Sequence, residues 1–164
     1  MNTLYSHIKL LRPLNVFTSG LAMIIASAIL GMLHEIDTVI LVMTVVLCYT
    51  AAANALNDVV DFEIDKINRP MRPLPSGSVE KQTALFISIL LFGTGTLLCL
   101  ELSEPAKIIG IVIAMPLMVI YSKYLKGIPL LGNIAIAFIL GLSFLFCGAA
   151  FNNMAPMWIP LALA

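Results

Sequence analysis

Long apolar runs separated by short polar stretches make up most of the chain. An α-helix needs about 20 apolar residues to cross a bilayer, and five of the runs reach or approach that length. The pattern therefore predicts five membrane-spanning helices and the beginning of a sixth apolar segment. The expected spans are 14–33, 38–65, 79–101, 105–124 and 130–151, followed by the short segment 157–164.

Polar and proline-rich stretches separate these runs. The longest, 66–81, contains three prolines and a glycine, which are incompatible with a continuous helix. Residues 5–12 form an amphipathic lead-in, Pro13 suits the start of the first span, and Pro116 predicts a kink in the fourth. The other expected breaks are 34–37, 103–105, 123–129 and 152–156.

Composition agrees with a membrane protein. Hydrophobic residues make up 60% of the chain and charged residues 11%, with a mean hydropathy of +1.03. Soluble domains are about 45–50% apolar and about 25% charged. We therefore expect one all-α polytopic transmembrane domain over residues 1–164. The zero net charge argues against a nucleic-acid partner.

The sulfur and imidazole groups do not form a recognisable site. Cys48, Cys99 and Cys147 all lie in apolar runs, and none has metal-ligand spacing to another cysteine or histidine. We expect them to be packing residues rather than disulfide partners. His7 and His34 are isolated, so neither is a candidate ligand.

Basic residues are distributed very unevenly across the expected membrane. Only Lys107 falls on one side, and the other eight fall on the opposite side. By the positive-inside rule that richer side is cytoplasmic, together with the amino terminus and the loops 66–81 and 123–129. The eight are Lys9, Arg12, Lys66, Arg69, Arg72, Lys81, Lys123 and Lys126.

The second span ends in a row of amides and carboxylates on this same side. At about 100° per residue, five polar side chains share an arc of roughly 100°, whereas Glu63 lies opposite. Clustered carboxylates repel one another unless a cation lies among them, and a hard divalent ion such as Mg²⁺ is the simplest candidate. A solvated loop is the plain alternative, and the spacing excludes an EF-hand. The five are Asn54, Asn57, Asp58, Asp61 and Asp65.

Arginine and lysine residues are expected on the same side of the membrane as these carboxylates. Carboxylates with a divalent ion, surrounded by Arg and Lys, are typical of a phosphate or diphosphate site. An apolar pocket between helices would accept an isoprenoid or acyl tail. The combination predicts a lipid diphosphate substrate, whose departing diphosphate would be stabilised by metal and arginine. The candidate cations are Arg12, Lys66, Arg69, Arg72, Lys123 and Lys126.

Several motifs resemble one known family, the UbiA-type intramembrane prenyltransferases. Residues 57–65, reading Asn-Asp-x-x-Asp-x-x-x-Asp, are similar to the first aspartate-rich motif of that family. The continuation 65–77, the Leu-Arg-Pro at 11–13, and the segments 121–126 and 132–133 are similar to it as well. The resemblance implies a UbiA-like helix bundle around a central cavity and Mg²⁺-dependent transfer from a prenyl diphosphate.

The resemblance also implies roles for individual residues. Tyr121 would present its ring to a developing allylic cation, although an interfacial tyrosine is an equal alternative. Asn133 would line the site, or simply pack between helices. The implied metal ligands are Asn57, Asp61 and Asp65; the catalytic residues are Asp58, Asp61, Asp65 and Tyr121; the diphosphate-binding residues are Asn57, Arg12, Arg69, Arg72, Lys126 and Asn133.

Within the family the loop 63–77 most resembles the branch that builds archaeal ether lipids. There a geranylgeranyl group passes from geranylgeranyl diphosphate to geranylgeranylglyceryl phosphate. Quinone and chlorophyll prenyltransferases share much of this loop, so aromatic and tetrapyrrole acceptors stay open. Donor length and oligomeric state are also open, and membrane lipids are expected neighbours.

One departure from the family bears on activity. Family members carry a second aspartate-rich motif, but no aspartate follows Asp65 in this chain. We therefore expect the chain to correspond to the amino-terminal part of a typical member and to have little activity alone. Two hypotheses from other functional classes stay open: an ion transporter and a non-catalytic lipid-binding module.

Overall fold

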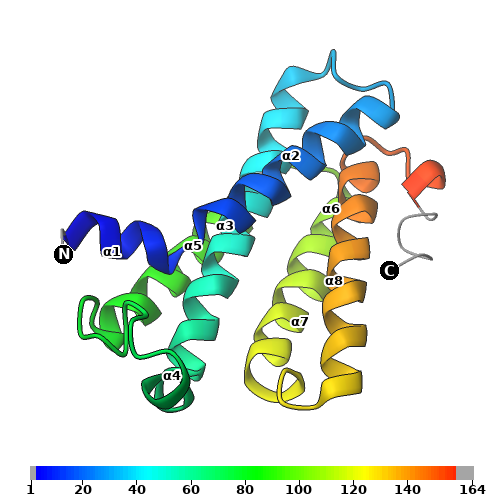
Figure 1. The fold of residues 1–164 in the computed structure, drawn as a ribbon. Helices are drawn as coiled ribbons and strands as arrows, with labels where there is room; N and C mark the ends of the chain where they lie inside the picture. The colour runs from blue at the N-terminus through cyan, green and yellow to red at the C-terminus, as the bar shows by residue number, and fades with distance from the viewer. Residues whose placement is uncertain (1–2, 158–164) are drawn as a thin grey trace.

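The computed structural model describes residues 3–157, and within them every regular element is helical (Figure 1). This confirms the predicted all-α fold. The final apolar segment, 158–164, lies outside the described residues. The elements are α1 (Thr3–Leu10), α2 (Pro13–Ile29), α3 (Ile36–Val60), α4 (Phe62–Asn68), α5 (Lys81–Cys99), α6 (Glu104–Lys107), the π-helical η1 (Ile108–Ala114), α7 (Met115–Ile120), the π-helical η2 (Tyr121–Leu125), α8 (Pro129–Ala150) and the 3₁₀ turn η3 (Ala155–Met157).

The expected number of membrane crossings agrees with the structure. Four helical stretches are long and apolar enough to span a bilayer, and α1 with α2 makes a fifth when that bent pair counts as one. The bend between α1 and α2 is 52°. The four stretches are Ile36–Val60, Lys81–Cys99, Glu104–Leu125 and Pro129–Ala150.

Arg12 makes the bend between α1 and α2 possible. Its backbone is left-handed, with a φ of 54°, and Pro13 then opens α2. A left-handed conformation costs a non-glycine residue roughly 1–2 kcal/mol. The surrounding contacts of Arg12 must therefore hold it there.

Alternate helices run in opposite directions, so their connections gather at two ends of the bundle (Figure 1). The lower end in that view holds α1, α4, the 69–80 loop and the turn between η2 and α8. The turns after α2 and α5 lie at the other end. The loops expected to share one membrane face therefore do share one end of the bundle.

Helix α3 is the central element of the core. Half of its apolar window is buried, more than in any other candidate span among the described residues. Tyr49 on α3 contacts Phe92 on α5 at a ring-centroid distance of 5.8 Å. All three cysteines are free, and Cys99 and Cys147 are buried, which agrees with their expected role in packing.

One predicted boundary is wrong in detail, and one span contains irregular turns that the sequence did not predict. The second span does not continue as one helix to Asp65, because α3 ends at Val60 and α4 begins at Phe62, with Asp61 between them. The fourth span contains two π-helical segments on either side of α7. Pro116 lacks a backbone N–H, so in a regular α-helix the carbonyl four residues before it would have no partner. A wider π turn lets such a carbonyl accept from the N–H five residues later instead.

Close packing of α3 on α5 depends on Gly95. A Cβ atom at this position would lie 2.7 Å from ring carbons of Tyr49. Tyr49 is 3% exposed and its hydroxyl is 3.1 Å from the Thr96 hydroxyl, so the ring has little room to move. Gly93, on the same helix, has open space where its Cβ would be.

We predict that Gly95→Ala lowers the free energy of unfolding by about 1–3 kcal/mol, because the methyl group overpacks the α3–α5 contact. Gly93→Ala is the matched control and should be neutral or stabilising, since alanine favours helix over glycine. Thermal unfolding of both variants in detergent measures the difference. Equal midpoints would contradict the proposed packing.

Candidate active site

Asp58 is a buried carboxylate held by two arginines. It is 4% exposed. Arg12 Nη2 lies 2.5 Å from Asp58 Oδ1, and Arg72 Nη1 lies 3.4 Å from the same oxygen. Asp58 thus joins the α1–α2 junction and the 69–80 loop to the end of α3.

Arg72 also links two acids of the motif. Its Nη1 donates to Asp65 Oδ2 at 2.5 Å, and Asp65 is 5% exposed. Asp58 lies on α3 and Asp65 on α4. One guanidinium group therefore holds carboxylates from both sides of the break at Asp61.

Asp61 points to a different partner. Its carboxylate forms an ion pair with Lys126, which follows η2. This contact closes the end of the bundle between the α3–α4 junction and the turn before α8. We call these three acids and three bases together the charge cluster: Arg12, Asp58, Asp61, Asp65, Arg72 and Lys126.

The backbone around Arg12 is fixed from α3. Asn54 Nδ2 donates to the carbonyl of Leu11 at 2.9 Å, one helical turn before Asp58. This bond and the Arg12–Asp58 pair hold the left-handed bend. Two adjacent turns of α3 therefore position the guanidinium of Arg12.

Arg72 is positioned by an ordered loop. Successive turns are closed by hydrogen bonds from Arg72 N to Arg69 O and from Ser76 N to Arg72 O, at 3.0 Å each. Leu74 and Val79 are buried in a small cluster that includes Leu10 on α1. The loop is therefore folded onto the bundle, and its arginine lies at a defined place.

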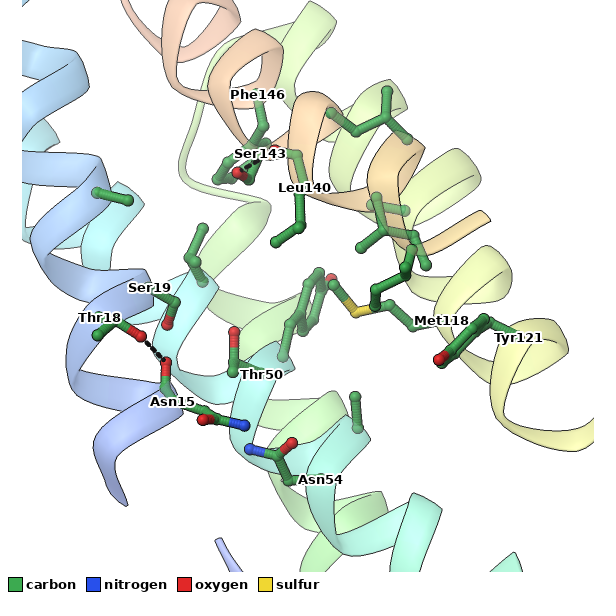
Figure 2. A pocket seen from close by; sticks show the side chains of 18 of the residues that line it. Asn15, Thr18, Ser19, Thr50, Asn54, Met118, Tyr121, Leu140, Ser143 and Phe146 are labelled. Carbon is green, nitrogen blue, oxygen red and sulfur yellow. Dashed lines mark hydrogen bonds between the residues drawn. The ribbon is translucent and has the colours of Figure 1, made fainter. Parts of the chain in front are cut away.

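An apolar cavity of about 470 Å³ is lined by residues of α2, α3, α7 and α8 (Figure 2), and Asn57, the residue before Asp58 on α3, is one of them. Tyr121 also lines this cavity. It begins η2, the segment that Lys126 follows. Asn57 Oδ1 is buried and has no hydrogen-bond partner among the described residues. Other lining residues include Asn15, Thr18, Ser19, Thr50, Asn54, Met118, Ile139, Leu140 and Phe144.

Most predicted site residues come together, and two do not. Arg69 is exposed and forms no ion pair within the described part of the chain. Asn133 is exposed at the start of α8 and does not line the cavity. Lys66, a further candidate cation, pairs instead with Glu63 and lies 4.3 Å from the centre of the Phe62 ring.

Sequence reasoning missed four polar side chains that line the cavity from α2 and α3: Asn15, Thr18, Ser19 and Thr50. Asn15, Thr18 and Ser19 interrupt an apolar run at i, i+3 and i+4, a spacing that puts them on one helix face. Thr50 and Asn54 repeat this spacing on α3. Polar residues within a membrane span that share one face are a signal of function.

No three His, Cys, Asp or Glu side chains in residues 3–157 are grouped closely enough to form a metal site by themselves. The oxygen ligands available are the carboxylates of Asp61 and Asp65 and the unpartnered oxygen of Asn57. Mg²⁺ commonly binds through one or two carboxylates and completes its shell with water and substrate phosphate. This ligand set fits that mode of binding.

Comparisons with known proteins point to a single family. The digeranylgeranylglyceryl phosphate synthase of Methanothrix thermoacetophila is 39% identical over 147 residues, covering 87% of this chain and 54% of that protein. The protein of the same name from Thermococcus gammatolerans is 39% identical over 152 residues, covering 92% of this chain and 55% of its own length. The chain thus spans about half the length of these curated relatives.

A solved structure agrees with the sequence comparison. A structure described as that of digeranylgeranylglyceryl phosphate synthase in membranes superposes with a TM-score of 0.91 at 35% identity, covering 98% of this chain and 58% of that one. The sequence profile of the UbiA prenyltransferase family matches residues 15–164. The chain belongs to the UbiA prenyltransferase family.

Proposed function

We propose that the protein transfers a prenyl group from a prenyl diphosphate to a glycerophosphate lipid. The observation that carries this proposal is the charge cluster beside an apolar cavity. The cluster suits a diphosphate and the cavity suits a hydrocarbon tail. The names of the relatives support a glycerophosphate acceptor and a geranylgeranyl donor, in agreement with the resemblance of the loop 63–77.

We propose that three cations of the cluster bind the diphosphate. The side chains of Arg12, Arg72 and Lys126 are 30%, 19% and 32% exposed, so each keeps a surface that a ligand can reach. A guanidinium has five N–H donors, and each arginine uses only a few of them on Asp58 and Asp65. The remaining donors would contact diphosphate oxygens.

Asn57, Asp61 and Asp65 would hold a divalent ion, and we propose Mg²⁺. When bound, the ion would neutralise charge on the diphosphate leaving group. Asp58 has a different task, because its Oδ1 is already shared by Arg12 and Arg72. We assign Asp58 as a positioning residue that aims the two arginines.

The reaction forms one carbon–oxygen bond and breaks another. The bond between the allylic carbon and the diphosphate oxygen breaks, and its electron pair leaves with the diphosphate. The acceptor hydroxyl oxygen bonds to that carbon, and its proton is released to the diphosphate. The ring of Tyr121, which lines the cavity, would face the positive charge that develops on the carbon.

We predict that Asp61→Asn and Asp65→Asn each lower transfer by at least about a hundredfold, because both remove a charge from the metal and diphosphate site. The assay measures product from geranylgeranyl diphosphate, using the complete gene product in lipid. Glu63→Gln is the matched control, since its carboxylate is exposed and its ion-pair partner among the described residues is Lys66. Full turnover in either aspartate variant would reject the assigned roles.

We also propose that the end of the bundle carrying the charge cluster faces the cytoplasm. Eight of the nine basic residues lie in the segments at that end. We predict that a cysteine replacing Lys123 reacts with a membrane-impermeant maleimide only in inside-out vesicles. A cysteine replacing Lys107 should react only in right-side-out vesicles, and the opposite pattern would reverse the orientation.

A further inference from the structure

The inner face of the fourth span keeps a regular helical spacing as far as Tyr121. Ala114, Met118 and Tyr121 all line the cavity, and they follow one another by four residues and then by three. The side chains of Met118 and Tyr121 both project from this span into the cavity (Figure 2). This spacing marks one face of an α-helix. In a regular α-helix the next residue on that face would be Tyr124 or Leu125, three or four positions after Tyr121.

The residue that joins the charge cluster is instead Lys126, which pairs with Asp61. At about 100° per residue, Lys126 would lie about 140° around an α-helix from Tyr121, on a different face. The π-helical turn η2 removes this mismatch. Lys126 N donates to Tyr121 O at 3.0 Å, so the backbone bond spans five residues instead of four. The fifth residue of the turn then lies on the same face as the first, as the fourth residue does in an α-helix.

The facing side of α3 has the ordinary α-helical spacing. Asn57 lines the same cavity as Tyr121, and Asp61 follows it by four residues, with Asp61 N donating to Asn57 O at 2.9 Å. Helix α3 and η2 pack against each other. One α-helical turn between Asn57 and Asp61 is therefore matched by one π-helical turn between Tyr121 and Lys126. The wider turn keeps the two rows of side chains in step.

Two contacts stabilise the wide turn. Ser122 is 2% exposed, and its Oγ donates to Met118 O at 2.8 Å. A serine hydroxyl that bonds to the carbonyl four residues earlier competes with the backbone N–H that a regular α-helix would use there. On the other side α8 packs closely on the end of the turn, because a Cβ atom at Gly132 would lie 3.0 Å from Leu125 O. The turn is therefore held from within its own span and from α8.

Single π turns are rare in proteins and are frequently found at functional sites. We propose that η2 is a positioning element, which places Lys126 on the helix face of Tyr121 so that the ammonium group reaches Asp61 and the diphosphate. This inference rests on the proposed function. It adds how one of the groups that bind the diphosphate is brought to the site.

The place of the lysine can be moved without changing the composition of the turn. The exchange variant combines Leu125→Lys with Lys126→Leu, which puts the lysine four positions after Tyr121. The wide turn directs that position off the shared face. We therefore predict that geranylgeranyl diphosphate binds at least about tenfold more weakly, the effect of one lost contact to a charged group. Binding is titrated with the complete gene product in nanodiscs, and thermal midpoints check that each variant is folded.

A one-residue insertion should reverse this loss. Inserting one alanine after Tyr124 in the exchange variant returns the lysine to the fifth position after Tyr121. Affinity should then recover to within about threefold of that of the unmodified protein. The matched control exchanges the neighbouring pair, Tyr124→Leu with Leu125→Tyr, which alters the same turn and leaves Lys126 in place. This control should bind the diphosphate as the unmodified protein does.

Unchanged affinity in the folded exchange variant overturns the inference. So does an equal loss in the control, or an insertion that restores nothing. Where the exchange variant does not fold, deletion of Tyr124 serves instead, since it leaves an ordinary α-turn with the lysine four positions after Tyr121. This deletion should keep the affinity, and a loss of about tenfold in the folded protein overturns the inference.

In all these cases prenyl transfer by the unmodified protein still upholds the proposed function. An unmodified protein that transfers a prenyl group to no acceptor overturns the proposed function, and the inference with it.

Discussion

A carboxylate buried at the end of a membrane bundle requires a cation, and this requirement organises the whole lower end of the protein. Asp58 and Asp65 are almost completely buried. An unpaired buried charge costs several kcal/mol, so each must recruit a basic partner. The partners, Arg12 and Arg72, lie in other segments of the chain, the α1–α2 junction and the 69–80 loop. Pairing therefore dictates where the α1–α2 junction and the 69–80 loop must lie.

The same pairing explains features that otherwise look unfavourable. Arg12 keeps a left-handed backbone because its side chain meets Asp58 and because Asn54 binds the carbonyl just before it. The Lys126–Asp61 pair ties the turn between the fourth and fifth spans to the end of α3. Three acids and three bases thus neutralise one another, and the cluster stays open enough for a ligand to exchange with them. This balance underlies the proposed binding of a diphosphate and a divalent ion.

Much of this architecture could be predicted from the sequence. Apolar runs of membrane length identify the spans, because every backbone polar group in lipid must be satisfied within a helix. The basic residues locate one face, and the spacing of Asp58, Asp61 and Asp65 places acids at the end of a span. These signals are local, and local periodicity is readable without knowledge of the fold.

The choice among similar residues could not be predicted in the same way. Arg69 and Arg72 both lie in an irregular loop, and only the tight turns of that loop decide that Arg72 reaches the acids. The helical wheel placed Asp61 with Asp65 because it assumed one continuous helix, whereas the helix breaks at Asp61. Asn133, which the resemblance assigned to the site, is exposed at the start of α8, and its role stays a prediction.

The pairing of Arg12 with Asp58 can be measured directly by a double-mutant cycle. The free energy of unfolding in mixed micelles is determined for Arg12→Gln, Asp58→Asn and the double variant. If the two side chains hold each other as described, the single effects are not additive and differ from the double effect by about 1 kcal/mol or more. Additive losses would show that the two residues act independently, and the account of how this end of the bundle is organised would be wrong.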